Sequence, residues 1–117
     1  MHEERPLPRR PRARRTPADR LRAALLALAD GHGIVRAHRE TPWASITFAG
    51  ARHRVVLCFE GAEAIAAGEQ FSADLPEHEF TIPGQLVADA TVVEVDHVLL
   101  PQPRLTVTAE LLLLEDV

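Results

Sequence analysis

The sequence predicts an α+β fold in which an antiparallel β-sheet packs against an N-terminal helix, with a second, short helix. Three observations lead to this expectation. A well-delimited helical stretch follows residue 16, segments rich in Val and Thr come later, and turn signals separate these segments. The order of elements is helix, three strands, short helix, two strands. We expect the first three strands to form a meander and the last two a long C-terminal hairpin.

Length and composition set limits on the class of protein. The 117 residues suit one domain, and 46% of them are hydrophobic. No apolar run approaches the about 20 residues that cross a bilayer, and the single cysteine excludes an internal disulfide. All 13 basic residues are arginine, a usage typical of a GC-rich bacterial genome. We therefore expect a soluble, cytoplasmic protein of bacterial type without a membrane contact.

The N-terminal segment differs from the rest of the chain. Residues 1–16 carry six arginines and three prolines but almost no apolar side chain, which predicts a flexible tail. We expect residues 17–117 to form a single domain. In that range seven arginines face fifteen acidic residues, a net charge of −8, which disfavours a dedicated nucleic-acid binder. Weak, salt-dependent contact with nucleic acid is left to the arginines of the tail. These are Arg9, Arg10, Arg12, Arg14 and Arg15.

The first helix has clear start and stop signals. Thr16 is suited to cap the free amides, Pro17 occupies the first helical position, and Asp19 completes a capping box. Gly31 and Gly33 supply the stop. Leucines recur at helical spacing and predict one apolar stripe. These leucines are Leu21, Leu25 and Leu28.

Residues 34–60 predict the meander. The strands are 34–40, 43–49 and 52–60, joined by two-residue turns at Thr41-Pro42 and Gly50-Ala51. The register that these turns impose collects the apolar side chains on one face and polar ones on the other. In this register His38 and His53 point to opposite faces of the sheet.

The second half predicts a short helix and a hairpin. Residues 61–75 suit a short helix followed by a loop, with Gly68 as the helix stop, and an extended segment is expected at Glu79–Ile82. The hairpin strands are Gln85–Leu99 and Arg104–Leu114, around a turn at Leu100–Pro103. Because fifteen residues is long for one strand, we expect a bulge near Asp89.

One candidate binding site lies on the polar face of the meander. Two guanidinium groups and an imidazole there suit an anionic small molecule, and an indole suits a ring that stacks on it. The candidate residues are Arg36, His38, Trp43 and Arg54. The alternative is the ordinary polar, solvent-facing surface of an antiparallel sheet. The sequence has no metal-binding or phosphate-loop motif and no nucleophile elbow, so we predict no catalytic residue, metal or cofactor.

One candidate interface lies on the last strand. Four consecutive leucines end it, so Leu112 and Leu114 point away from the core that the first helix covers. We expect Val92 to lie opposite Leu112 and to extend this apolar patch. Such patches usually mark interfaces, and a homodimer is the commonest result. The alternative is a monomer in which the short helix near residues 61–67 covers the patch.

These observations favour a non-catalytic module that associates with itself or with a partner. One alternative is a small enzyme or ligand-binding domain for an anionic small molecule on the polar face of the meander. A second alternative is accessory nucleic-acid binding through the tail.

Overall fold

The computed structural model describes residues 15–116, which form two helices and a four-stranded antiparallel sheet in the order β1-β2-β4-β3. The α+β class predicted from the sequence is confirmed. The elements are α1 (Pro17–Leu28), β1 (Ile34–Ala44), β2 (Ala49–Glu60), α2 (Ala62–Asp74), η1, a 3-10 turn (Leu75–Glu77), β3 (Gln85–Val98) and β4 (Arg104–Glu115). No helix among the described residues is long and apolar enough to cross a membrane.

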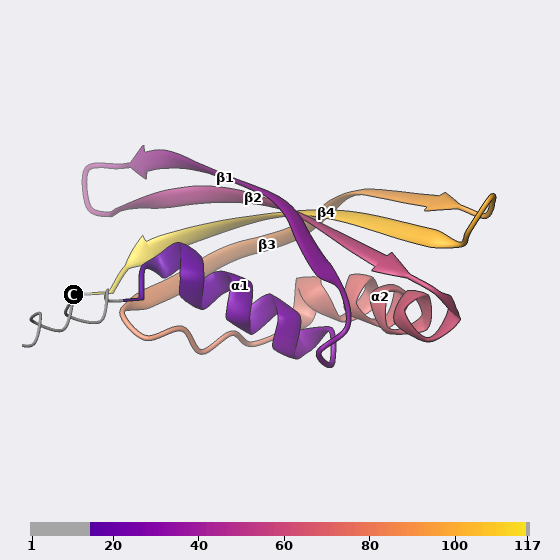
Figure 1. Ribbon diagram of the computed structural model, residues 1–117. Coiled ribbons are helices and arrows are strands. Elements are labelled where there is room, and N and C mark those ends of the chain that lie inside the picture. The colour runs from indigo at the N-terminus through magenta and orange to yellow at the C-terminus, as the bar shows by residue number, and fades with distance from the viewer. Residues whose placement is uncertain (1–14, 117) are drawn as a thin grey trace, which may run out of the picture.

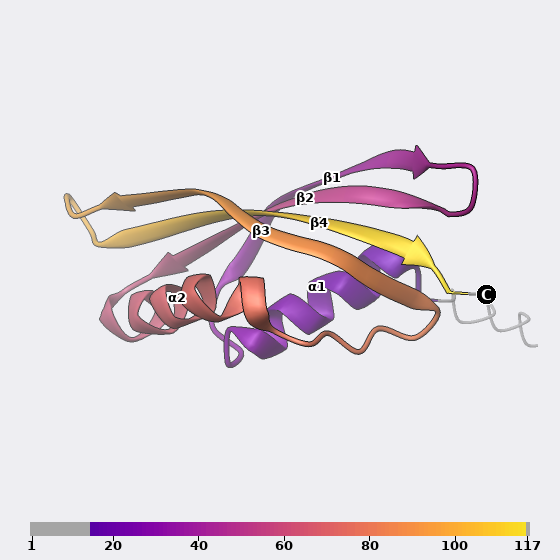
Figure 2. The same cartoon turned by 180° about the vertical axis from the view of Figure 1, so that it is seen from behind.

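Both helices lie on the same side of the sheet, as Figures 1 and 2 show from opposite directions. We call this side the inner face and the opposite side the outer face. The core sits between the helices and the inner face, mainly on the central strands β2 and β4. Its largest fully buried side chains include Leu21, Leu25, Leu57, Phe59, Phe71, Leu105 and Leu111. No described element covers the outer face.

The helix α1 forms as its sequence predicts. The Thr16 hydroxyl accepts a hydrogen bond of 3.1 Å from the Asp19 amide, and the Asp19 carboxylate accepts one of 3.1 Å from the Thr16 amide. This is the expected capping box. Leu21 and Leu25 are fully buried, so the leucine stripe is the face that packs on the sheet.

The predicted three-strand meander is wrong, because residues 34–60 form one long hairpin. β1 continues through Thr41 and Pro42, and the turn lies further on, where the Ser45 amide donates to the Phe48 carbonyl at 2.7 Å. β1 is an edge strand, and a proline is tolerated there if its missing N–H is not needed for the ladder. The turn is therefore set by Ser45, whose hydroxyl also accepts a hydrogen bond from the Phe48 amide at 3.0 Å.

Gly50 lies within β2 and does not make the second predicted turn. It pairs with Trp43 on one side and with Leu114 on the other. A Cβ added at Gly50 would collide with the backbone of Leu113 and Leu114. The glycine therefore permits close approach of β2 and β4.

Bulges shift the face that each strand presents. In β1 the register slips between Val35 and Ala37, so Arg36 is an extra residue. The long strand β3 contains the expected irregularity next to Asp89, between Val87 and Asp89, and a second one after Val92. Each bulge reverses the alternation of inner and outer side chains beyond it.

The helix α2 is longer than predicted and does not end at Gly68. Gly68 is buried in the middle of the helix, close to Phe59 and Leu105 of the sheet. Because α2 packs on the inner face, it does not cover the outer leucines, and that sequence-based alternative is wrong. After α2, Ile82 forms an isolated bridge with Gln85, the only residue of the expected extended segment that pairs as a strand.

Candidate functional site

The four residues predicted to bind an anion do not share one site. His38 is paired with Val55, a fully buried core residue, and so lies on the inner face. Arg54 is exposed on the outer face, because its neighbours Val55 and His53 point inward. Arg36 is the bulge residue and lies 3.4 Å from the Glu60 carboxylate. Trp43 is half-buried opposite Gly50, near the end of the hairpin. The predicted register brought them together, and the observed one separates them.

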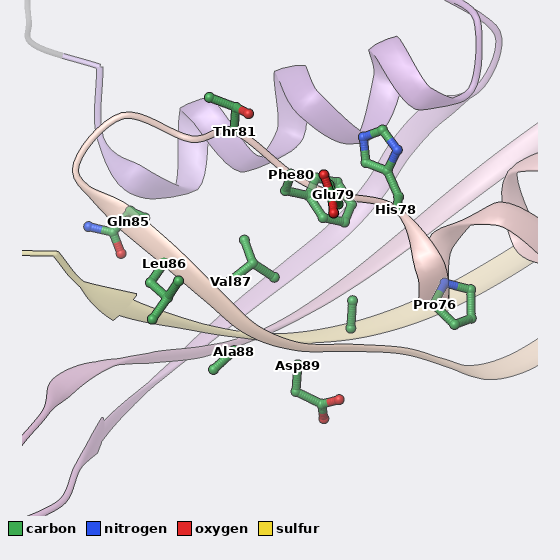
Figure 3. A pocket seen from close by; sticks show the side chains of 11 residues that line it. Pro76, His78, Glu79, Phe80, Thr81, Gln85, Leu86, Val87, Ala88 and Asp89 are labelled. Atoms are coloured by element: carbon green, nitrogen blue, oxygen red, sulfur yellow. The ribbon is translucent and has the colours of Figure 1, made fainter.

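A groove of about 510 Å³ lies between β3 and the segment that precedes it. Figure 3 shows its lining, which includes Pro76, His78, Glu79, Phe80 and residues 85–90. The charged side chains in this lining are the carboxylates Glu79 and Asp89. None of the four predicted residues lines this groove, and two carboxylates do not suit an anionic ligand.

The most distinctive polar arrangement is a chain of hydrogen bonds from α1 into the sheet. Arg22 lies 2.8 Å from Nδ1 of His38, and Nε2 of His38 lies 2.8 Å from Nδ1 of His53. A guanidinium has only donors, so Nδ1 of His38 must accept from Arg22. A neutral His38 then carries its proton on Nε2 and donates it to His53. The chain therefore has a fixed direction.

Acidic groups flank both ends of this chain. Asp19 forms an ion pair with Arg22 one helical turn away. The Thr16 backbone amide that donates to Asp19 is the main reason the pKa of this carboxyl is lowered, and the nearby Arg22 adds to the effect. At the other end, a Glu40 carboxylate oxygen lies 4.0 Å from Nδ1 of His53, beyond hydrogen-bond distance.

Burial is the main cause that lowers the pKa of both histidines below the ordinary value of 6.5. For His38, the charges of His53 and then Arg22 lower the pKa further, while Glu40 and Asp19 oppose them. For His53, Glu40 opposes burial and Arg22 reinforces it. The fold therefore favours the neutral form of both rings, which is the form that the directed chain requires.

The histidine pair links α1 to the sheet. Both ring nitrogens of His38 are engaged, and only 1% of His53 is exposed. Residues 15–116 contain no group of three His, Cys, Asp or Glu side chains that converge on a metal. The sequence-based register placed the two histidines on opposite faces, which is wrong. The bulge at Arg36 and the continuous strand through Pro42 bring them together.

The outer face carries charge of opposite sign on its two halves. Directly paired residues share a face, so the outer residues follow from the register. The β1–β2 half presents Arg39, Arg52 and Arg54. The β3–β4 half presents Asp89, Glu94, Asp96 and Glu110. The exceptions, Glu60 and Arg104, lie opposite each other at one end of β2 and β4.

The predicted interface residues are divided between the two faces. Leu112 lies on the outer face between Arg52 and Asp89, and Leu114 lies between Gly50 and Leu86. Their neighbours leave only 9% and 6% of them exposed. Val92 is paired with Ala109 and packs beside the core on the inner face, so its expected place opposite Leu112 is wrong. The hairpin turn, which pairs Val98 with Arg104, and the bulge after Val92 account for this difference.

Comparison with known proteins finds no significant similarity. The chain matches no family model, and it has no significant similarity to a curated protein or to a solved structure. The geometry thus defines a class, a two-layer α+β protein with a one-sided helical layer, and its function has to be argued from its own surfaces.

Proposed function

We propose that this protein is a non-catalytic module that associates with a second copy of itself through the outer face of its sheet. The observation that carries the proposal is the helix layer, which covers one face only. An antiparallel sheet with one solvated face normally carries polar residues there. Here Leu112 and Leu114 occupy a central strand of that face, and Leu86 beside them is 51% exposed.

The sheet edges support the choice of the face as the interface. β1 carries a bulge and a proline, and β3 carries two bulges with acidic residues along its length. Bulges, prolines and charges are the features by which proteins discourage strand pairing at an edge. Edge-to-edge association is thus disfavoured at both edges of the sheet, which favours the outer face as the interface.

The test uses Leu86, because it is exposed and a charge there does not have to enter the core. We expect the wild-type protein to be a dimer by light scattering, and Leu86→Glu to be a folded monomer. Leu100→Glu is the matched control, since Leu100 is 81% exposed in the β3–β4 loop, outside the outer face. This control stays dimeric.

Two results would contradict the proposal. One is a wild-type protein that stays monomeric at high micromolar concentration. The other is a Leu86→Glu variant that dimerises as well as Leu100→Glu, which would move the interface away from this face.

A further inference from the structure

We propose that the two copies pack outer face to outer face about a two-fold axis that runs parallel to the strands, between β2 and β4. Arg54 of each copy then meets Glu110 of the other. This inference rests on the proposed self-association, and it adds the geometry and the charged pairs that select the partner.

Only two orientations of a two-fold axis bring the outer faces of identical sheets together in line with the strands. An axis across the strands lays each strand over its own copy. An axis parallel to the strands and between β2 and β4 lays β2 over β4, and β1 over β3. The strand order β1-β2-β4-β3 makes β2 and β4 the central pair about which this second axis passes.

The charges of the outer face distinguish the two orientations. An axis across the strands would lay the arginine half of each copy over the arginine half of the other, and the carboxylate half over the carboxylate half. Like charges brought together at an interface oppose association. The axis parallel to the strands places the arginine half of each copy over the carboxylate half of the other. The surface is thus complementary to itself in only one of these orientations.

Arg54 and Glu110 lie where a crossing angle between the two sheets disturbs the alignment of the two copies least. Sheets that pack face to face cross at about 30°, so residues far from the crossing point lose alignment. Arg54 is the sixth of the 12 residues of β2, and Glu110 is the seventh of the 12 residues of β4. Both therefore lie near the crossing point, where the angle displaces them least.

These two side chains are also available for such a contact. Their Cα positions are paired within one chain, yet they form no ion pair with each other in the described structure. Arg54 is exposed, and Glu110 is half-buried. Around the two-fold axis the four groups alternate in sign, so each guanidinium lies between two carboxylates.

The neighbouring row agrees with this arrangement. Arg52 is paired with Leu112 within one chain, so the same axis places Leu112 of one copy against Arg52 of the other. The aliphatic part of an arginine covers apolar surface while its charged end stays in water. Leu112 therefore has an apolar contact across the interface, although no helix covers the outer face.

Mixing two charge-reversal variants tests the register. We expect Arg54→Glu and Glu110→Arg each to weaken the dimer by at least about tenfold, because each creates two repulsive contacts in its homodimer. In the mixed dimer of the two variants, both contacts again join opposite charges. Native mass spectrometry of the mixture should therefore show the heterodimer, at close to the wild-type affinity, and few homodimers.

A control mixture tests whether a change in net charge alone would produce the heterodimer. Glu69→Arg reverses a charge on α2, and Glu69 is exposed on the helical layer. The heterodimer of Glu69→Arg with Arg54→Glu retains one repulsive contact. We therefore expect it to be weaker than the heterodimer of Arg54→Glu with Glu110→Arg. Circular dichroism of each variant confirms that it is folded.

The results distinguish a failure of the proposed axis from a failure of the proposed self-association. A monomeric wild type contradicts both proposals. A dimeric wild type with single variants of unchanged affinity, or with a test mixture that forms no more heterodimer than the control, overturns the axis and leaves self-association standing.

Discussion

The imidazole rings of His38 and His53 are joined by a hydrogen bond of 2.8 Å, with ring centroids 5.0 Å apart. The two residues come from adjacent strands, and His38 in turn accepts from Arg22 of α1. One hydrogen-bonded chain therefore links α1, β1 and β2. The neutral state of both rings holds this chain together, and this leads to the first two predictions.

Acidification should destabilise the protein as the pH falls below about 6.5. Both histidines have pKa values lowered in the fold, so the unfolded chain binds protons that the folded chain does not. Stability is therefore fully present above the ordinary histidine pKa of 6.5 and decreases as the pH falls through the lowered values. Each histidine adds a slope of at most about 1.4 kcal/mol per pH unit. Urea unfolding between pH 7.5 and 5 measures this dependence.

Variants assign this pH dependence to the pair. His53→Leu removes one titrating group from a site that is already apolar on its core side, and the slope should decrease. His97→Gln changes an exposed histidine on β3 and should leave the slope close to that of the wild type. If the two variants lose the same slope, the acid sensitivity has another source.

Removal of the Arg22 charge should raise the pKa of both histidines. The guanidinium lowers the pKa of His38 and of His53, so Arg22→Met shifts both titrations to higher pH. The methionine keeps a long side chain against the sheet. NMR titration of the imidazole protons measures each pKa. Arg20→Met, on the same helix, is the control and should leave both titrations in place; equal shifts in the two variants would exclude the direct contact.

The N-terminal cap of α1 is a feature that the sequence predicts in full. Thr16→Ala should destabilise the protein by about 1 kcal/mol, because the Asp19 amide loses its acceptor. Leu25→Ala should cost more, about 2–5 kcal/mol, since Leu25 is fully buried under the sheet. Chemical denaturation of both variants gives the comparison, and a Leu25 variant as stable as the wild type would contradict the packing of this helix.

The sequence predicted the fold class because local signals determine it. The capping box of α1, the Val- and Thr-rich hairpin and the bulge next to Asp89 all follow from residue types and spacing within a few positions. These features do not depend on which strand lies beside which. The α+β class and the antiparallel sheet could therefore be derived before the structure was known.

The candidate site could not be derived, because it depends on strand register. Thr41-Pro42 resembles a turn, but the chain stays extended there as an edge strand. A single extra residue at Arg36 then moves His38 to the face of His53. Neither event has a strong local signal, since bulges and edge prolines are set by pairing partners that are distant in the sequence. An error of one residue exchanges the two faces of a strand.

Gly68 provides a final prediction, in which the sign of the effect decides whether this face of α2 is open or packed closely on the sheet. On an open helix face, alanine at this position would stabilise the protein by about 1 kcal/mol. In the structure, an added Cβ would lie 2.7 Å from the ring carbons Cδ2 and Cγ of Phe59 and 2.9 Å from a Leu105 methyl group. Both side chains are almost completely buried, so they have little freedom to move.

Gly68→Ala should therefore destabilise the protein by about 1–3 kcal/mol through overpacking, despite the higher helix propensity of alanine. Phe59→Leu removes the ring that the Cβ meets, so Gly68→Ala should cost less in that background. A double-mutant cycle by urea unfolding measures this coupling between positions 59 and 68. A stabilising Gly68→Ala, or a cost that is the same with leucine at position 59, would show that α2 does not pack this closely on β2.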